Sequence, residues 1–533
     1  MGGLCMNLSI SIPEKKIKKI LQFIDRIRLL RLTIFVTIFL AIVSTAIAFN
    51  NDLIVAYGDA ESHLNIAKRV IHGLTPGFAQ LGGIWLPMPH ILMIPFVYFD
   101  FLWRTGLAGS IVSGLTFIVS SIFLFKLTKL LTGNKYAAFF SSLVFVLNPN
   151  ILYLQSTPMT ELPLVAFFIL SSYFFIKYIR EENDILSLLL SAFFGFCAVL
   201  TRYDGWFLVL FEALTILLLY FHKKESWSKI EGKLILFSTL AFFGVLIWMM
   251  WDLLILGDPF YFTNSQFSAR TQQQNWLRRG ELPAYHNIFL AFAYYLVTSM
   301  SNTGVIVFAA GVIGLIWYIK NKKDSHRFFI LFILLVPFIF NVFTMFVGQS
   351  VIFIPHLTPV SFEWRLFNVR YGVLMIPVLS LFFAYAFFKA KEAGSKALVI
   401  FLLILQLGLY VVGYSKIITL ADGVEGLSRA RRPDAEYWIK EHYDNGLVLV
   451  DDYARTLSII RSGIPMQNII YIGNKPYWEE SLVAPERYAS WIIMQKNDDV
   501  WKAIYDKPNV QDRLFKYFQK TYTSPQILIF RRI

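Results

Sequence analysis

Apolar runs of about twenty residues recur along this chain, separated by short polar tracts. A run of that length crosses the roughly 30 Å hydrocarbon core of a bilayer as a helix, which satisfies its own backbone hydrogen bonds in lipid. The composition agrees, because 56% of the 533 residues are hydrophobic and only 16% are charged, against roughly 25% charged in soluble domains. The sequence therefore predicts an all-α polytopic membrane protein.

The predicted spans begin close to the N-terminus. Residues 1–28 are basic, with apolar residues at helical spacing, and we expect an amphipathic helix there on the cytoplasmic leaflet. The first span, 29–49, is long for a cleaved signal, so we interpret it as an uncleaved anchor although Ala46-Ile47-Ala48 resembles a signal-peptidase site. The other predicted spans are 107–131, 136–154, 162–180, 185–201, 206–221, 234–256, 303–319, 328–347, 371–389 and 397–418.

Two further apolar stretches, 86–103 and 288–300, are ambiguous, and the positive-inside rule decides between the alternatives. The basic tracts between spans all fall on the cytoplasmic side only if neither stretch crosses the bilayer. We therefore expect about eleven spans, and up to about thirteen if both stretches cross, with the N-terminus inside and everything after Leu420 outside. The same distribution of basic residues argues against a nucleic-acid-binding surface, despite a net charge of +14.

This predicted topology divides the chain into three parts: the N-terminal segment 1–28, a transmembrane domain at 29–419 and an extracytoplasmic domain at 420–533. The first outer loop of the transmembrane domain is 50–106. The third part is polar, and its short apolar runs alternate with helical patterns, which predicts a small α/β domain. The expected strands are 447–450, 469–472, 490–494 and 527–530, and the expected helices are 433–443, 453–462, 498–505 and 510–520.

Carboxylates gather in the loops on the predicted outer side. The first outer loop reads Tyr57-Gly58-Asp59-Ala60-Glu61-Ser62-His63, followed by apolar residues at helical spacing. Asp59 lies near the start of that helix, where the helix dipole favours an ionised carboxylate that can act as a base or metal ligand. Glu161 begins a later span, where a carboxylate is costly unless it is paired or hydrated. The alternative for each acid is that it only caps a helix or complements its dipole.

Three arginines and a histidine on the same predicted side are candidates for binding an anion. Arg202 lies where a span emerges, and Arg365 and Arg370 precede another span in an aromatic-rich stretch. Arginine offers permanently charged, bidentate contacts to phosphate, although an interfacial arginine can also simply reach lipid headgroups. His90 follows a proline-rich stretch, where it is a candidate phosphate contact or metal ligand, or a buried structural histidine.

Together these features resemble the GT-C glycosyltransferases, and within them the prokaryotic protein O-mannosyltransferase and aminoarabinose transferase branch. The resemblance covers most of 29–418 and rests on the order of Asp59-Ala60-Glu61 with its amphipathic helix, the proline-rich juxtamembrane stretch, Glu161 and a C-terminal outer domain. It implies a polyprenyl-phosphate-linked sugar as donor, with Asp59 as the catalytic base, Glu61 and Glu161 as further acids, and Arg370 on the donor phosphate.

One departure from that family concerns the cation near the proline pair. Family members often place a lysine before it, whereas this chain reads Trp85-Leu86-Pro87-Met88-Pro89-His90. We therefore expect His90 or another cation, Arg202 or Arg365, to contribute to phosphate binding. The residues expected around the sugar and the acceptor are Tyr57, His63, Trp85, Asp204 and Tyr371.

The expected reaction is an inverting sugar transfer on the extracytoplasmic side of the cell membrane. Asp59 would take the proton of the acceptor hydroxyl as it attacks the anomeric carbon, and an arginine would stabilise charge on the leaving phosphate. No cofactor is required, although Asp59, Glu61 and Glu161 are the set that would bind Mg²⁺ or Mn²⁺. The two cysteines, Cys5 and Cys197, lie too far apart in sequence and context to suggest a disulfide framework or a zinc site.

Two other functions stay open from the sequence. A lipid-linked glycan polymerase or ligase would share the donor type and carry a large outer loop rich in arginine and histidine. A lipid or sugar transporter, such as a flippase, would show paired discontinuous helices and polar groups at the middle of the bilayer. The sequence does not identify the sugar, or whether the acceptor is a protein, a lipid or a glycan.

Overall fold

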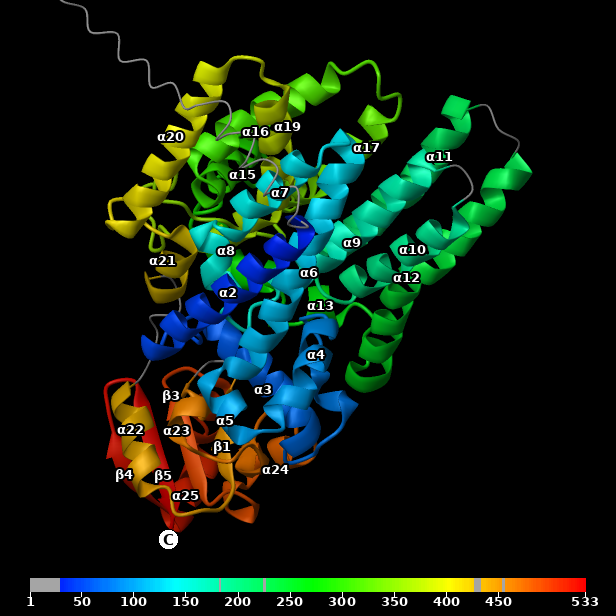
Figure 1. Cartoon of the computed structure of the whole chain (residues 1–533). Helices are drawn as coiled ribbons and strands as arrows, with labels where there is room; N and C mark the ends of the chain where they lie inside the picture. Colours follow the sequence, from blue (N-terminus) through cyan, green and yellow to red (C-terminus); the bar gives the residue numbers. More distant parts are fainter. Residues whose placement is uncertain (1–28, 182–183, 224–226, 426–432, 453–455) are drawn as a thin grey trace, which may run out of the picture.

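The computed structural model describes residues 29–533 apart from 182–183, 224–226, 426–432 and 453–455. The amphipathic helix expected within 1–28 lies outside the described residues. Figure 1 shows a body of long helices with the C-terminal sheet at one end. Helices α3 (Gly58–His72) and α5 (Asp100–Thr105) lie where the two parts meet, and α4 (Met88–Val97) runs from there along the helical body.

The helical body is that of a multi-pass membrane protein. Within the described residues, six helices are long and apolar enough to cross a bilayer, or eight if each of two bent helix pairs is one span. The helices of this body are α2 (Leu29–Asn50), α6 (Leu107–Thr132), α7 (Lys135–Val146), α8 (Pro149–Leu154), α9 (Glu161–Arg180), α10 (Ile185–Val199), α11 (Asp204–Lys223), α12 (Trp227–Leu256), α15 (Ile288–Thr303), α16 (Val305–Ile319), α17 (Arg327–Leu334), α18 (Val336–Phe346), α19 (Ile376–Lys389) and α20 (Ala393–Val411).

The predicted number of spans, about eleven, stays a prediction. Three of the apolar helices, α4, α7 and α10, are shorter than a full span, and the pairs α15–α16 and α17–α18 bend by 116° and 50°. A bent pair can be one broken span or a segment that enters and leaves the bilayer on the same side. Length and apolarity therefore do not fix the count.

Two breaks in the helices have clear local causes. The predicted span 136–154 is interrupted because the Asn148 side chain accepts hydrogen bonds from the backbone N–H groups of Asn150 and Ile151, and Pro149 occupies the first turn of α8. The ambiguous stretch 288–300 forms α15, which turns sharply into α16 at Gly304. Gly304 has φ = +86°, a backbone conformation in which a residue with a Cβ atom would be strained.

Short helices connect the long ones on the side of the C-terminal sheet. One of them, the 3₁₀ helix η2, immediately precedes α19, and α21 follows α20 and leads toward the C-terminal part. The remaining short elements of the first 425 residues are η1 (Phe78–Leu81), α13 (Tyr261–Asn264), α14 (Ala269–Arg278), η2 (Val369–Met375) and α21 (Ile418–Glu425).

The C-terminal part is the small α/β structure that the alternation of runs predicts. Its five-stranded sheet has the order β2-β1-β3-β5-β4, with β1 parallel to β2 and β3, and β5 antiparallel to β3 and β4. The four expected strands are present, and a fifth, β4, occupies residues partly expected to be helical. The elements are α22 (Pro433–His442), β1 (Val448–Val450), α23 (Ile459–Ser462), η4 (Met466–Asn468), β2 (Ile469–Ile470), α24 (Tyr477–Val483), η5 (Pro485–Arg487), β3 (Trp491–Gln495), η6 (Trp501–Tyr505), α25 (Pro508–Tyr517), β4 (Phe518–Thr523) and β5 (Ile527–Arg532).

Candidate active site

Helix α3 presents Asp59 in its first turn. Asp59 Oδ2 accepts a hydrogen bond from Nη2 of Arg370, 311 positions later in the chain, at 2.8 Å. The N-cap position belongs to Tyr57, which makes no side-chain capping bond, so Asp59 is not the helix cap that the sequence left as an alternative. The positive end of the helix dipole and the guanidinium both favour the ionised carboxylate.

Arg370 lies in η2 and joins the two acidic segments. Its guanidinium is buried, with Nη2 on Asp59 and Nε donating to Glu161 Oε1 at 3.1 Å. Glu161 is the first residue of α9 and is fully buried. The first loop and the start of α9, separated by about one hundred residues in sequence, therefore supply carboxylates to a single arginine.

Arg202 extends this cluster on the other side of Glu161. Its Nη1 donates to the same Oε1 of Glu161 at 3.2 Å, and its Nε donates to Asp204 Oδ2 at 3.2 Å. The ring of Tyr371 faces both guanidiniums, with centroid distances of 4.8 Å to Arg202 and 5.2 Å to Arg370, which are cation–π distances. The two arginines are thus held side by side by shared partners.

Asp422 is a further member that the sequence reading did not single out. It lies in α21, is 2% exposed, and its Oδ2 is 3.8 Å from Nη1 of Arg370 and 3.4 Å from the hydroxyl of Tyr57. That hydroxyl donates to the backbone oxygen of Thr419 at 2.5 Å. Burial raises the pKa of Asp422 to about 6, and the Coulomb field of Arg370 opposes the shift. The only local signal was an isolated acid in the apolar sequence Ile417–Asp422 just after the last predicted span.

His63, Trp85 and His90 form a separate group beside Asp59. His63 Nδ1 and His90 Nε2 are 2.9 Å apart, and the ring of His63 lies 4.6 Å from that of Trp85. Burial lowers the pKa of His63 to about 4 and that of His90 well below its usual value. A neutral imidazole supplies no positive charge, so the expectation that His90 takes the place of a phosphate-binding lysine finds no support here.

Two other expected site residues lie elsewhere. Glu61 Oε2 accepts from Ser458 Oγ at 2.7 Å, and Oε1 accepts from the backbone N–H of Ile460 at 3.1 Å, both at the start of α23. The expectation that Glu61 converges with Asp59 is therefore wrong, because residues two apart on a helix point to different sides. Arg365 is also outside the cluster: it is exposed and donates to the backbone oxygen of Pro355 at 3.0 Å.

The metal site considered from the sequence stays a prediction, although Asp59, Glu61 and Glu161 do not come together as one set of ligands. Within the part of the chain that the structure describes, no group of three or more His, Cys, Asp or Glu side chains is arranged to hold a metal ion. The proposed third ligand, Glu61, is bound to α23, and the other two carboxylates are occupied by arginines.

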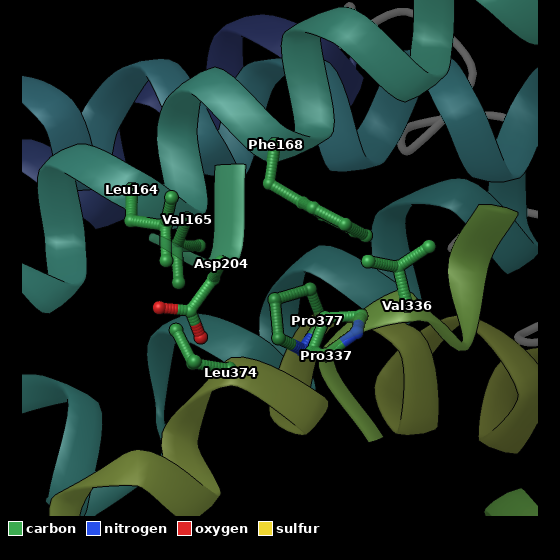
Figure 2. Close-up of a pocket in the computed structure, with 8 residues that line it drawn as sticks. All are labelled: Leu164, Val165, Phe168, Asp204, Val336, Pro337, Leu374 and Pro377. Carbon is green, nitrogen blue, oxygen red and sulfur yellow. The ribbon is translucent and has the colours of Figure 1, made fainter. Parts of the chain in front are cut away.

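An apolar pocket adjoins the cluster at Asp204. It lies between α9, α18 and the start of α19, and Figure 2 shows the Asp204 carboxylate among its lining side chains. Asp204 Oδ1 is buried and has no hydrogen-bond partner among the described residues, while Oδ2 accepts from Arg202. The other lining residues are Leu164, Val165, Phe168, Val336, Pro337, Leu374 and Pro377. An apolar wall therefore lies directly beside the arginine cluster, in which Arg370 is buried and Arg202 is partly exposed.

Comparison with known proteins identifies a matching family model and solved structures with a similar fold. Residues 100–251 match the family model described as dolichyl-phosphate-mannose-protein mannosyltransferase. ArnT from Cupriavidus metallidurans, solved bound to undecaprenyl phosphate, superposes with a TM-score of 0.58 at 12% sequence identity, covering 94% of this chain and 97% of that one. The chain has the GT-C fold. It resembles the ArnT and protein mannosyltransferase branch of the GT-C superfamily.

A second protein with the GT-C fold differs more from this chain in length. The archaeal oligosaccharyltransferase AglB from Archaeoglobus fulgidus, solved with an inhibitory peptide and a dolichol-phosphate, gives a TM-score of 0.50 at 12% identity, covering 93% of this chain and 73% of that one. ArnT in the apo state gives 0.51 at 13% identity, covering 92% and 98%. No curated protein matches the chain in a sequence search. At these identities the GT-C neighbours establish the fold.

Proposed function

We propose that this chain is a membrane glycosyltransferase that moves a sugar from a polyprenyl-phosphate-linked donor to an acceptor hydroxyl, with Asp59 as the base. The observation that carries the proposal is that Asp59 and Glu161 meet the guanidiniums of Arg370 and Arg202 beside an apolar pocket. Both ArnT and AglB have been solved with a polyprenyl phosphate lipid, and the GT-C fold is shared with them.

The base requires a carboxylate that is ionised and oriented. Asp59 meets both needs, because Arg370 fixes one oxygen at 2.8 Å and the N-terminus of α3 favours its negative charge. Its side chain remains partly exposed at 23%, whereas that of Glu161 is fully buried. Asp59 is therefore the acid that an acceptor hydroxyl reaches, and Glu161 orients the arginines.

In the reaction, Asp59 takes the proton of the acceptor hydroxyl while the hydroxyl oxygen bonds to the anomeric carbon. The bond between that carbon and the phosphate oxygen breaks with inversion, and the electron pair leaves with the lipid phosphate. Arg370 and Arg202 stabilise the charge that develops there, because buried guanidiniums act more strongly than hydrated ones. The apolar side chains around Asp204 give the lipid end of the donor a surface away from water.

Transfer assays on the purified full-length protein in lipid nanodiscs test this function. The donors are a panel of radiolabelled polyprenyl-monophosphate sugars and one polyprenyl-diphosphate glycan. We expect turnover with a monophosphate donor and a loss of at least about 100-fold in Asp59→Asn. Asp52→Asn is the matched control, since Asp52 is an exposed acid of the same loop whose positive φ asparagine tolerates.

The outcomes separate the parts of the proposal. Unchanged turnover in Asp59→Asn would remove the base assignment while leaving a transferase. Turnover with the diphosphate glycan alone would replace the sugar donor by a lipid-linked oligosaccharide. No turnover with any lipid-linked donor would contradict the proposed function.

A further inference from the structure

Several carboxylates gather around two arginines in the described part of the candidate active site. The described side chains joined by its ion pairs are the carboxylates of Asp59, Glu161, Asp204 and Asp422 and the guanidiniums of Arg202 and Arg370. A donor phosphate would add another negative charge next to them, which low-dielectric surroundings strongly disfavour.

Arg370 already has carboxylates on all three of its nitrogens. Asp59 and Glu161 hold Nη2 and Nε at 2.8 and 3.1 Å, whereas Asp422 lies 3.8 Å from Nη1, beyond hydrogen-bond distance. A phosphate oxygen that binds Arg370 while Asp59 stays in place as the base therefore competes first with Asp422, whose carboxylate lies farthest from the guanidinium. Asp204 does not compete for this nitrogen, because it pairs with Arg202.

The surroundings of Asp422 allow it to become neutral. From η2 it faces Arg370, whose charge and backbone N–H both favour the ionised form. From α3 and the residue before it, Asp59 disfavours that form, whereas the hydroxyl of Tyr57, 3.4 Å away, favours it. Helix α8 brings the phenol of Tyr153 close to the backbone of Gly423, and α15 contributes tyrosines but no charged residue. Near the ends of α21 itself, Lys416 and Glu425 pair with each other at the surface. Burial is the largest influence, and it raises the pKa of Asp422 to about 6.

We propose that Asp422 is a residue of the donor-phosphate site and yields Nη1 of Arg370 to the phosphate by taking up one proton. The proton comes from the solvent: an O–H bond of hydronium breaks as the carboxyl O–H bond forms, which leaves water. The phosphate oxygen then replaces the carboxylate beside the guanidinium. The proposal rests on the proposed function, since it assumes a lipid phosphate as ligand. It makes Asp422 a proton-coupled gate on donor binding, distinct from the base Asp59.

Direct binding measured against pH tests the gate. The probe is the methyl phosphodiester of undecaprenol, added to full-length protein in neutral-lipid nanodiscs. A diester keeps one negative charge throughout, whereas a monoester gains a second near about pH 6. For the wild type we expect affinity to fall about tenfold per pH unit above about pH 6, because each ligand bound requires one proton to be taken up.

Asp422→Asn carries a permanently neutral side chain of the same shape, and we expect it to bind the diester tightly with an affinity that no longer depends on pH. Glu425→Gln is the control: it neutralises an exposed acid of the same helix and should keep the wild-type slope. Thermal unfolding of each variant shows that it is folded.

Each outcome has a distinct meaning. A pH-independent wild type that binds, an Asp422→Asn variant that retains the slope, or one that binds more weakly than wild type at low pH would each overturn the gate alone. A wild type that binds the diester at no pH would contradict the proposed function itself.

Discussion

Arg370 bonds two carboxylates through two different nitrogens of its guanidinium. A lysine at this position keeps the charge but can direct only one compact ammonium at the acids. We expect Arg370→Lys to lower kcat/KM for transfer by about 100-fold, because Asp59 loses its fixed orientation and the phosphate loses a donor. Steady-state assays with saturating acceptor measure this.

The control for this change is Arg365→Lys. Arg365 is exposed and donates to the backbone oxygen of Pro355, outside the arginine cluster, so the conservative change there should leave transfer near the wild-type rate. Equal losses in the two variants would show that Arg370 acts merely as one of several interfacial cations.

His63 links the stability of the site to pH. Its pKa is about 4 in the folded protein, against 6.5 in an unfolded chain, so the unfolded state binds the proton first as the pH falls. The free energy of unfolding should therefore decline from about pH 7 to about pH 4, by up to about 3 kcal/mol from this residue. His90, whose pKa is also lowered by burial, contributes with the same sign.

Thermal unfolding across that pH range measures the effect. We expect a flatter profile in His63→Gln and an unchanged one in His442→Gln, which alters an exposed histidine. A wild-type melting temperature that is constant between these pH values would mean that His63 takes up its proton in the folded state.

The sequence could predict that the acids lie in loops on one side of the spans, but not every residue that contacts them. Asp59, Glu161 and Arg370 stood out because charged residues at the ends of apolar spans need a reason to be there. Glu61 was misplaced by proximity in sequence, although two positions along a helix correspond to about 200° of rotation. Asp422 was overlooked because its role depends on where α21 packs, which no local pattern encodes.

At the scale of elements, two faces of α3 contact different parts of the protein. Asp59 and His63, four residues apart, face the arginine cluster and Trp85. Glu61 and Arg69, eight residues apart, face the C-terminal domain, where Arg69 pairs with Asp452. The helix that positions the proposed base is thus anchored from behind by the C-terminal domain.

This anchoring predicts a specific effect of Glu61→Gln. An amide can accept from only one of the two donors, Ser458 and Ile460, and leaves its own N–H₂ facing the other. We expect a loss of about 1–3 kcal/mol in the free energy of unfolding, with KM for the donor rising less than kcat falls, because Asp59 shifts.

Denaturant or thermal unfolding and initial-rate kinetics on the same preparations measure both effects. Glu479→Gln is the control and should be neutral, because Glu479 is an exposed acid of α24 that pairs with Lys475 at the surface. A stable but inactive Glu61→Gln would instead place Glu61 in the chemistry.

Most long helices could be predicted from the lengths of the apolar runs in the sequence. The exceptions lie where local backbone structure interrupts a helix or forms a strand instead. Residues 136–154 read as one span because their apolarity is continuous, yet Asn148-Pro149 ends one helix and starts another. Strand β4 was read as the end of a helix, since its polar alternation is that of an exposed edge strand, and it pairs only with β5. These features depend on backbone hydrogen bonding that hydropathy does not report.

At the scale of the whole molecule, opposite ends of the helical body differ in charge. Helix α9 begins at Glu161 in the site and ends about 30 Å away at Arg180. Arg180 bonds the backbone oxygen of Leu130 and pairs with Asp324, and Lys389 donates to Trp317 near the same end. The basic tracts between helices therefore gather away from the acidic site.

By the positive-inside rule, this asymmetry predicts that the basic end is cytoplasmic and that the site and the C-terminal domain are extracytoplasmic. Fusions of the chain truncated after Arg180 should be active with a reporter that works in the cytoplasm. Fusions after Leu420 should be active with one that works outside. The reverse pattern would place the proposed donor on the cytoplasmic side.

Asp59 and Tyr57 lie early in the sequence, whereas their partners Arg370 and Asp422 come much later. Arg370 lies in the last quarter of the helical body, and Asp422 lies in the segment that follows it. During synthesis, the first spans insert long before these partners leave the ribosome. A nascent chain halted after α12 would have Arg202 for Glu161 and Asp204, but Asp59 would still lack Arg370. On the proposed function, the site is therefore complete only after the chain has been translated beyond Asp422.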